Sequence, residues 1–176
     1  MKQINKYICD HFENDKFSIL GHLKNPKFSI VERLHINKDT TNYYNYHPKT
    51  YDELEELVNK LMKERGDDAD LNDIDTSEIT DMSELFYNSD FNGDISEWDV
   101  STVTDMSAMF CESKFTGENG DISDWDVSNV KDMNYMFYSS SFNGDLSNWD
   151  VSKVEDMGEM FLQSPLQSNT PKWYKE

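Results

Sequence analysis

Carboxylates are the only side chains in this sequence that recur densely enough to do chemistry. Asp and Glu number 35 against 16 Lys and Arg, a formal net charge of −19. Paired carboxylates could serve a glycosidase as acid and base, or bind calcium. Other chemistry has little support, because all four histidines lie in the first 50 residues without metal-ligand spacing. Cys9 and Cys111 are expected to be two free thiols, although a disulfide stays possible, because no signal segment indicates an oxidising compartment.

The carboxylates recur at the same places in three nearly identical segments. Residues 92–106 read NGDISEWDVSTVTDM, residues 119–133 read NGDISDWDVSNVKDM, and residues 143–157 read NGDLSNWDVSKVEDM. An active site would break such a repeat at one place, whereas structural residues are repeated with it. We therefore expect no enzymatic activity, and the sequence contains no motif that calls for a cofactor.

The repeat period predicts the fold class. Asp-Met pairs begin at Asp81, Asp105, Asp132 and Asp156. The middle interval is longer by three residues, which lie between Phe115 and Asn119, and residues 70–82 are an earlier, divergent copy. A period of 20–29 residues is typical of leucine-rich-repeat-like solenoids. We therefore expect an α/β fold, a short right-handed solenoid of about four 24-residue units.

Each unit is predicted to contain one very short strand and one short helix. The strand follows the Asn-Gly turn, at Asp-Ile-Ser or Asp-Leu-Ser, and successive strands would pair in parallel. Val103, Met106 and Phe110 have the spacing of one helical face. The tryptophans of the repeat are expected to stack along the core; they are Trp98, Trp125 and Trp149.

Composition divides the chain into four segments. Residues 1–50 carry a net charge of +3 and read as an N-terminal extension or a tether, whereas residues 51–176 carry −22. The apolar spacing of residues 51–66 predicts an amphipathic capping helix, which begins with a capping box at Thr50–Glu53. Residues 67–164 form the repeats, and residues 165–176 a C-terminal cap in which Trp173 covers the last layer.

Residues 67–176 resemble the BspA-like leucine-rich-repeat family, especially its mycoplasma-lipoprotein-type repeat. The resemblance rests on the core WDVSxVxDMxxMF, which recurs from Trp98, Trp125 and Trp149. It implies a bacterial origin and a role like that of bacterial surface proteins implicated in adhesion and protein binding. The lead-in, YNYHPKT followed by a helix and DLNDID, also resembles leaders of repeat proteins from gut bacteria and their phages. Because the N-terminus has no apolar signal segment, we expect a cytoplasmic or virion-associated protein, although the family precedent is the cell surface.

The repeated aspartates form two predicted columns. One contains Asp94, Asp121 and Asp145, and the other contains Asp99, Asp126 and Asp150. Like charges about 4.8 Å apart repel by roughly 0.9 kcal/mol even in water, so something must tolerate them. Hydrogen bonds within turns are the favoured explanation. The alternative is weak cation binding at Asp99, Asp126 and Asp150, with no dedicated metal site.

The leading function predicted from the sequence is a non-enzymatic protein–protein interaction module with an acidic surface. The short-strand face would bind the partner through nine residues: Asp94, Ser96, Glu97, Asp121, Ser123, Asp124, Asp145, Ser147 and Asn148. The expected partner is a basic or polar protein, because the acidic chain disfavours direct nucleic-acid binding. No stretch is long and apolar enough to predict membrane insertion.

Three other functions stay open at this stage. The protein could be a structural, virion-associated or assembly-associated component tethered by residues 1–50. It could be a surface adhesin, as the resemblance suggests. It could also be an inhibitor that mimics DNA, because residues 66–160 contain 24 acidic and 3 basic side chains. The oligomeric state is not predicted.

Overall fold

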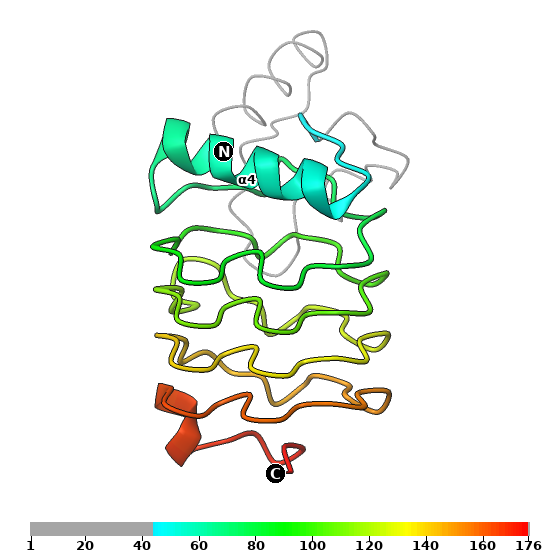
Figure 1. Ribbon diagram of the computed structural model, residues 1–176, viewed down its shortest axis with the longest axis vertical. Coiled ribbons are helices and arrows are strands. Elements are labelled where there is room, and N and C mark those ends of the chain that lie inside the picture. The colour runs from blue at the N-terminus through cyan, green and yellow to red at the C-terminus, as the bar shows by residue number, and fades with distance from the viewer. Residues whose placement is uncertain (1–43, 176) are drawn as a thin grey trace, which may run out of the picture. The chain divides into compact units, whose positions relative to one another are not determined.

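The structure is a computed structural model that describes residues 44–175. The described residues belong to the unit that spans residues 42–176. In that unit the repeats form successive turn-rich layers, and one α-helix covers the first layer (Figure 1). The predicted N-terminal extension lies outside the described residues up to residue 43.

The predicted N-terminal helix is present as α4, which spans Tyr51–Arg65. Thr50 caps it by accepting a hydrogen bond from the Glu53 N–H, and Glu53 accepts one from the Lys49 N–H instead of from Thr50 as in a regular capping box. Gly66, at φ 90°, ends the helix. Leu54, Val58 and Leu61 are buried against the layers. No helix within residues 44–175 combines the length and apolarity needed to span a bilayer.

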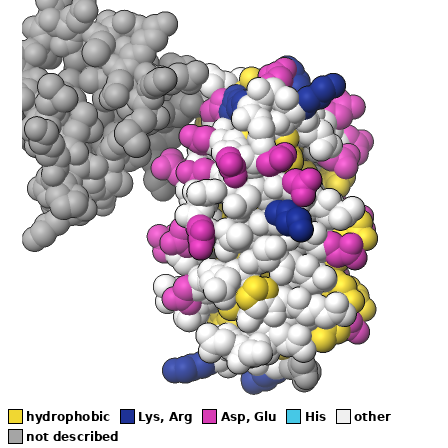
Figure 2. Space-filling model, turned by 90° about the vertical axis from the view of Figure 1, so that its left-hand side faces the viewer, with side chains coloured by type: hydrophobic (Ala, Val, Ile, Leu, Met, Phe, Trp, Pro, Cys, Tyr) yellow, Lys and Arg dark blue, Asp and Glu magenta, His cyan; other side chains and the backbone are white. Residues whose placement is uncertain are grey.

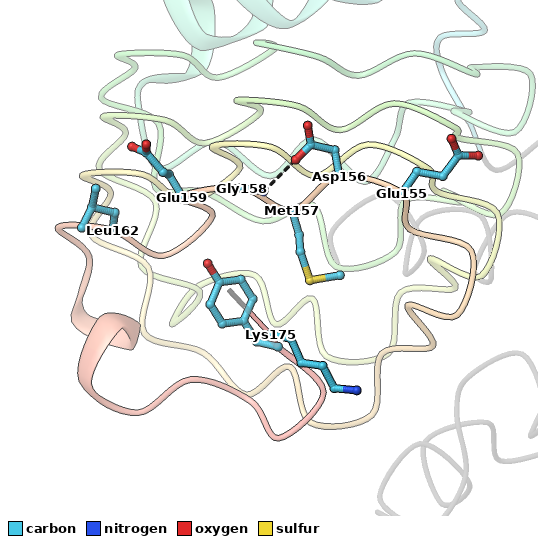
Figure 3. A pocket seen from close by; sticks show the side chains of 8 residues that line it. Glu155, Asp156, Met157, Gly158, Glu159, Leu162 and Lys175 are labelled. Atoms are coloured by element: carbon cyan, nitrogen blue, oxygen red, sulfur yellow. Dashed lines mark hydrogen bonds between the residues drawn. The ribbon is translucent and has the colours of Figure 1, made fainter.

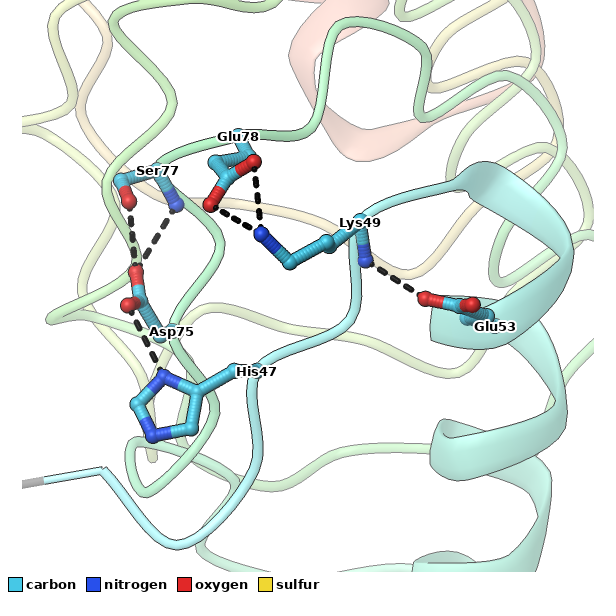
Figure 4. Close-up of polar contacts among 6 residues, drawn as sticks. All are labelled: His47, Lys49, Glu53, Asp75, Ser77 and Glu78. Atoms are coloured by element: carbon cyan, nitrogen blue, oxygen red, sulfur yellow. Dashed lines mark hydrogen bonds and ion pairs between the residues drawn. The ribbon is translucent and has the colours of Figure 1, made fainter.

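Residues 44–50 pack on the first repeat unit rather than standing apart from it. Tyr46 forms a parallel bridge with Ile74. His47 contacts Asp75, and Lys49 pairs with Glu78, as Figure 4 shows. The last part of the predicted N-terminal segment therefore belongs to the capped end of the repeats.

The prediction of an α/β leucine-rich-repeat solenoid is wrong. Within the described residues the regular elements are α4 and one short 3-10 helix, η1, Pro165–Ser168. No strand forms there, and successive units are joined only by isolated parallel bridges. One bridge joins Asp70 to Asp94. Three more join Asp81 to Asp105, Asp105 to Asp132, and Asp132 to Asp156.

The segment predicted as a short helix is instead a run of tight turns. Ala108 and Glu112 have φ angles of 52° and 57°, in the left-handed region that interrupts an α-helix. The same two positions are left-handed in every unit, at Glu84 and Asn88, Tyr135 and Ser139, and Glu159 and Gln163. Apolar residues at i, i+3 and i+7 are thus buried without a helix.

Backbone hydrogen bonds between layers replace the helical ones. The N–H groups of Met106, Ala108 and Phe110 donate to the carbonyls of Asp132, Asn134 and Met136, at 2.8–2.9 Å. The alternating N–H groups bond locally: those of Met109 and Cys111 donate to carbonyls three residues back, and that of Ser107 donates to Asp105 Oδ1. Half of the segment's donors therefore bind the next layer, which an α-helix could not allow because its donors are satisfied internally.

Two columns of phenylalanines form the centre of the core. Phe86, Phe110, Phe137 and Phe161 stack with centroids 5.5–5.9 Å apart and rings within 4° of parallel. A second column contains Phe91, Phe115 and Phe142, with spacings of 6.0 and 5.9 Å. The predicted tryptophans are buried beside these columns. Two of the three indoles donate across layers, Trp98 Nε1 to the Leu71 carbonyl at 3.0 Å and Trp149 Nε1 to the Ile122 carbonyl at 3.1 Å.

The three-residue insertion interrupts this pattern once. Phe115 stacks between Phe91 and Phe142, and Gly120 approaches the preceding layer as Gly93 does, so the three extra residues lie within residues 116–119. Trp149 Nε1 and Trp173 Nε1 bond to carbonyls 27 residues earlier, at 3.1 and 2.8 Å. Trp125 Nε1 is buried without a hydrogen-bond partner. The insertion lies in the same unit as Trp125. By alignment of the repeats, the carbonyl that the Trp125 indole would be expected to bind is that of Ile95.

Close approach of layers explains the glycine of the Asn-Gly pair. A Cβ at Gly93 would lie 2.0 Å from the Ala69 carbonyl oxygen. That carbonyl accepts the Asp94 N–H at 3.0 Å. Gly93 is therefore required by the contact between layers, whereas its φ lies outside the left-handed region.

Candidate interaction surface

Six of the nine predicted partner-binding residues are already engaged in turns. Each Asp-x-Ser segment is an Asx turn, in which the aspartate Oδ1 accepts the N–H two residues later. For Asp94, Asp121 and Asp145 these distances are 2.9–3.0 Å. Ser96 and Ser147 also donate their hydroxyls to the same oxygens, at 2.7 and 2.6 Å. These side chains hold the backbone in place.

The column predicted as a weak cation site has the same geometry. Asp99, Asp126 and Asp150 each accept the N–H two residues later at 3.0–3.1 Å. The hydrogen bonds from Ser128 hold the pKa of Asp126 below its ordinary value, although the charge of Asp150 opposes this. Within residues 44–175 no three His, Cys, Asp or Glu side chains are grouped so that they could hold a metal ion.

The other three predicted residues, Glu97, Asp124 and Asn148, are exposed. Each follows an Asx turn and precedes a buried tryptophan, so its Cα position is fixed from both sides. Asp73 occupies the same position in the first unit, before the buried Ile74. We call these four residues the variable column: Asp73, Glu97, Asp124 and Asn148.

One member of the variable column already binds a cation. Arg65, at the end of α4, donates Nη1 and Nη2 to the two carboxylate oxygens of Asp73 at 2.8 and 2.9 Å. Nη1 also donates to the Asp70 carbonyl at 2.8 Å, and the guanidinium lies 5.9 Å from the centre of the Tyr46 ring. Burial of Asp73 disfavours its charge, but hydrogen bonds from Arg65 and Asn45 outweigh burial and lower its pKa.

Arg65 itself shows the same coupling from the other side. Its hydrogen bond to Asp73 raises the pKa of the guanidinium, against the opposing effect of burial. Bidentate arginine–carboxylate pairs are among the strongest and most directional polar contacts in proteins. A carboxylate of the variable column can therefore bind a guanidinium through two hydrogen bonds.

The sequence did not predict that tyrosines would be exposed on a second surface. Tyr87 and Tyr135 are 49% and 39% exposed and are the exposed large hydrophobic residues of the described chain. Tyr135 packs edge-on against Tyr138, with centroids 5.5 Å apart. The two tyrosines stand at different positions of the repeat, where the other units mostly have other residues. This variation was the signal in the sequence that could have marked them as exposed. At the position of Tyr87 the next unit has Cys111, a buried free thiol whose pKa is raised by burial.

Two open hollows lie on the layers. One is at the C-terminal end and is drawn in Figure 3; its lining includes Met157, Glu159, Leu162, Tyr174 and Lys175. The other, of about 400 Å³, lies between α4 and the first unit, where Tyr51, Glu55 and Asn59 face Glu84 and Tyr87. The face drawn in Figure 2 shows acidic side chains over many layers and few Lys or Arg.

His47 lies in an arrangement that resembles a catalytic triad in composition but not in order. Its Nδ1 is 3.1 Å from Asp75 Oδ2, and Ser77 Oγ donates to Asp75 Oδ1 at 2.7 Å (Figure 4). In a triad the imidazole lies between the serine and the carboxylate and takes the serine proton. Here the carboxylate lies between the other two, so His47 does not activate Ser77.

The helix and the repeats together match a known family. A family model described as "Mycoplasma protein of unknown function, DUF285" matches residues 53–173. The chain belongs to the DUF285 family. This supports the mycoplasma-type part of the resemblance seen in the sequence, and leaves its leucine-rich-repeat part without support. No curated protein and no solved structure matches the chain.

The DUF285 match covers the parts of the molecule that carry both surfaces. It begins within α4 and ends at Trp173, so it includes Arg65, the whole variable column and both exposed tyrosines. The family description assigns no activity. The chemistry of these surfaces is therefore the guide to function.

Proposed function

We propose that this DUF285 protein is a non-enzymatic protein–protein interaction module. It would bind a basic or polar protein partner through the variable column. The repeats act as a rigid support, and the residue chosen at each position of the column determines the partner.

The observation that carries the proposal is the contact between Arg65 and Asp73. It shows a guanidinium bound at one position of the column by a bidentate carboxylate and a backbone carbonyl. Asp124 is the closest equivalent in the later units, since it too is an aspartate three residues after the aspartate of an Asx turn. An arginine from a partner would find the same kinds of group there.

Rigidity and charge support the same function. The Asx turns on either side of each column position leave little backbone entropy to lose when a partner binds. Residues 51–176 carry a net charge of −22, which attracts a basic partner over long distances and accelerates its association. The expected interface is polar and therefore sensitive to salt.

The test is to reverse charge in the column of the full chain. In the triple variant Glu97→Lys, Asp124→Lys and Asn148→Lys, partners captured from the native lysate and identified by mass spectrometry should be lost. A control with the same change in charge, Asp90→Lys, Glu118→Lys and Thr170→Lys, alters exposed residues outside the column and should retain them. Both variants should melt like the wild type.

Other outcomes would favour the competing functions. Partners that survive the column variant but are lost when residues 1–43 are deleted would indicate a tethered assembly component. Partners that are DNA-binding proteins, displaced by DNA from both the wild type and the control, would indicate DNA mimicry. Either result would overturn the proposal.

A further inference from the structure

The hollow between α4 and the first repeat unit combines two aromatic rings with two carboxylates. Tyr51 and Glu55 come from the first turns of α4, and Glu84 and Tyr87 come from the first turn-rich segment. The amides of Asn59 and Asn88 complete the wall. Side chains that are distant in sequence thus meet in one open space of about 400 Å³.

The fold does not account for these side chains. Tyr87 is 49% exposed, so its ring contributes little to the core. Neither Glu55 nor Glu84 forms an ion pair within residues 44–175. The hollow therefore presents two unpaired carboxylates beside exposed aromatic surface.

The same protein shows which ligand such a combination binds. At Arg65 a guanidinium lies over the ring of Tyr46 and is held by both oxygens of Asp73. A tyrosine face attracts a cation through its quadrupole, and a carboxylate supplies hydrogen bonds and charge. The hollow contains two of each group, but no cation of the described residues lines it.

We propose that the hollow formed by Tyr51, Glu55, Glu84 and Tyr87 is a binding pocket for an arginine side chain of another protein. The guanidinium would lie against the tyrosine rings and donate to the two carboxylates. Arginine fits better than lysine, because its planar, five-donor group can stack and form bidentate hydrogen bonds at once. The amide oxygens of Asn59 and Asn88 can accept further donors.

The electrostatics of the tyrosines agree with this assignment. Burial and the nearby charges of Glu55, Asp81 and Glu84 raise the pKa of Tyr51. The charge of Glu112 raises the pKa of Tyr87, with smaller effects from burial and from Glu84. Both phenols therefore stay neutral at physiological pH, and the potential around them favours a cation.

The pocket shares no residue with the variable column, so a small probe can test it independently of any partner of that column. The experiment titrates the isotopically labelled full chain with N-acetyl-arginine amide and follows backbone amide shifts by NMR. We expect weak, saturable binding, with the largest shifts at residues 51, 55, 84, 87 and 88. N-acetyl-citrulline amide, which has the same shape without the charge, should bind at least about tenfold more weakly.

Two variants test whether the carboxylates and the tyrosine ring of the pocket bind the arginine. Glu55→Gln with Glu84→Gln should weaken arginine binding by about tenfold or more, whereas Tyr87→Phe should retain it because the ring is kept. The control is Glu64→Gln with Glu118→Gln, which removes the same charge from α4 and from the repeats outside the pocket. If citrulline binds equally well, if shifts spread evenly over the acidic surface, or if the control weakens binding as much, the pocket assignment is wrong.

Discussion

The two ends of the layered unit are closed in different ways. At the N-terminal end α4 lies across the first layer, with Leu54, Val58 and Leu61 buried beneath it. At the C-terminal end the residues after η1 act as a lid, in which Trp173 stacks on Trp149 at 6.5 Å. The helix is a regular element with its own internal hydrogen bonds, whereas the lid is held by a few aromatic contacts and the hydrogen bond from Trp173 Nε1 to the Leu146 carbonyl.

The difference shows that covering the core and satisfying the backbone are separate tasks. In the turn-rich segments, alternate N–H groups donate forward to the next unit, and the last unit has no layer to receive them. The N–H groups of Met157, Glu159 and Phe161 have no acceptor within residues 44–175. The lid buries Phe161 but leaves this hydrogen-bonding edge open, beside the hollow in Figure 3.

Hydrogen exchange should show the largest contrast between the ends. The Glu84 and Tyr135 amides donate to carbonyls of the next layer at 2.9 Å. They should exchange only when the layers unfold, at rates several orders of magnitude below those of unstructured amides. The exposed Glu159 occupies the equivalent position without an acceptor and should exchange at close to the rate of an unstructured amide. Equal protection of Glu159 and Tyr135, measured by NMR, would show that the edge is covered.

Removing buried apolar surface beneath α4 should be the most destabilising substitution at the ends. Leu61 is fully buried, and Leu61→Ala should reduce the free energy of unfolding by about 3 kcal/mol, through lost burial and the cavity left behind. Urea denaturation measures this, with exposed Lys60→Ala on the same helix as a control that should change little. A loss below about 1 kcal/mol would mean that α4 is not the main closure of this end.

Truncating the lid should cost less than truncating the helix contact. Trp173→Ala removes the stack on Trp149 and the hydrogen bond to the Leu146 carbonyl, but the side chain is only half-buried. We expect a loss of about 2 kcal/mol in the same urea experiment. Lys172→Ala, an exposed neighbour, is the control. A larger loss than that of Leu61→Ala would reverse the ranking of the two ends.

Acid should weaken the N-terminal end through its depressed carboxylates. At Asp73 and Asp75 burial opposes the charge, but hydrogen bonds outweigh it and lower both pKa values. The folded pKa is then below the unfolded value of about 3.9, so the stabilisation is complete above that value and is lost as pH falls through the folded pKa. NMR titration in about 0.5 M NaCl, which screens repulsion among the other carboxylates, measures both groups. Values at or above about 3.9 would contradict the effect.

The contact between Arg65 and Asp73 should have the smallest effect on stability. Arg65→Gln removes the charge and the bidentate hydrogen bond from a partly exposed pair, so the expected loss is about 1 kcal/mol. The pKa of Asp73 should rise in the same variant, because Arg65 provides two of the contributions that lower it. Lys63→Gln, in the same last turn, is the control and should leave that pKa unchanged.

Much of the interior was predictable because it depends on periodicity. The capping helix and the buried tryptophans all follow from apolar spacing and from the period of 24 residues. The insertion was found within a residue or two. What failed was the backbone within each unit, because the same apolar spacing suits a helix and a run of turns whose donors bind the next layer.

The candidate surfaces were predictable only in part. The turn bonding of the aspartates followed from Asp-x-Ser segments, and the exposed positions Glu97, Asp124 and Asn148 followed from their variation between units. The arginine contact was not predictable, because Arg65 meets Asp73 and Tyr46 only after α4 folds back on the first layer. The pocket beside Tyr87 was missed for the same reason.

The sequence by itself determined the number of units, the place of the extra residues, the helix and the inward-facing side chains, because these depend on local spacing. The tertiary structure decided the conformation of each unit, because it depends on bonds such as that between Met106 and Asp132, 26 residues apart. It also decided which tyrosines and carboxylates lie together. Those groupings depend on how layers and helix are stacked, and no local pattern encodes them.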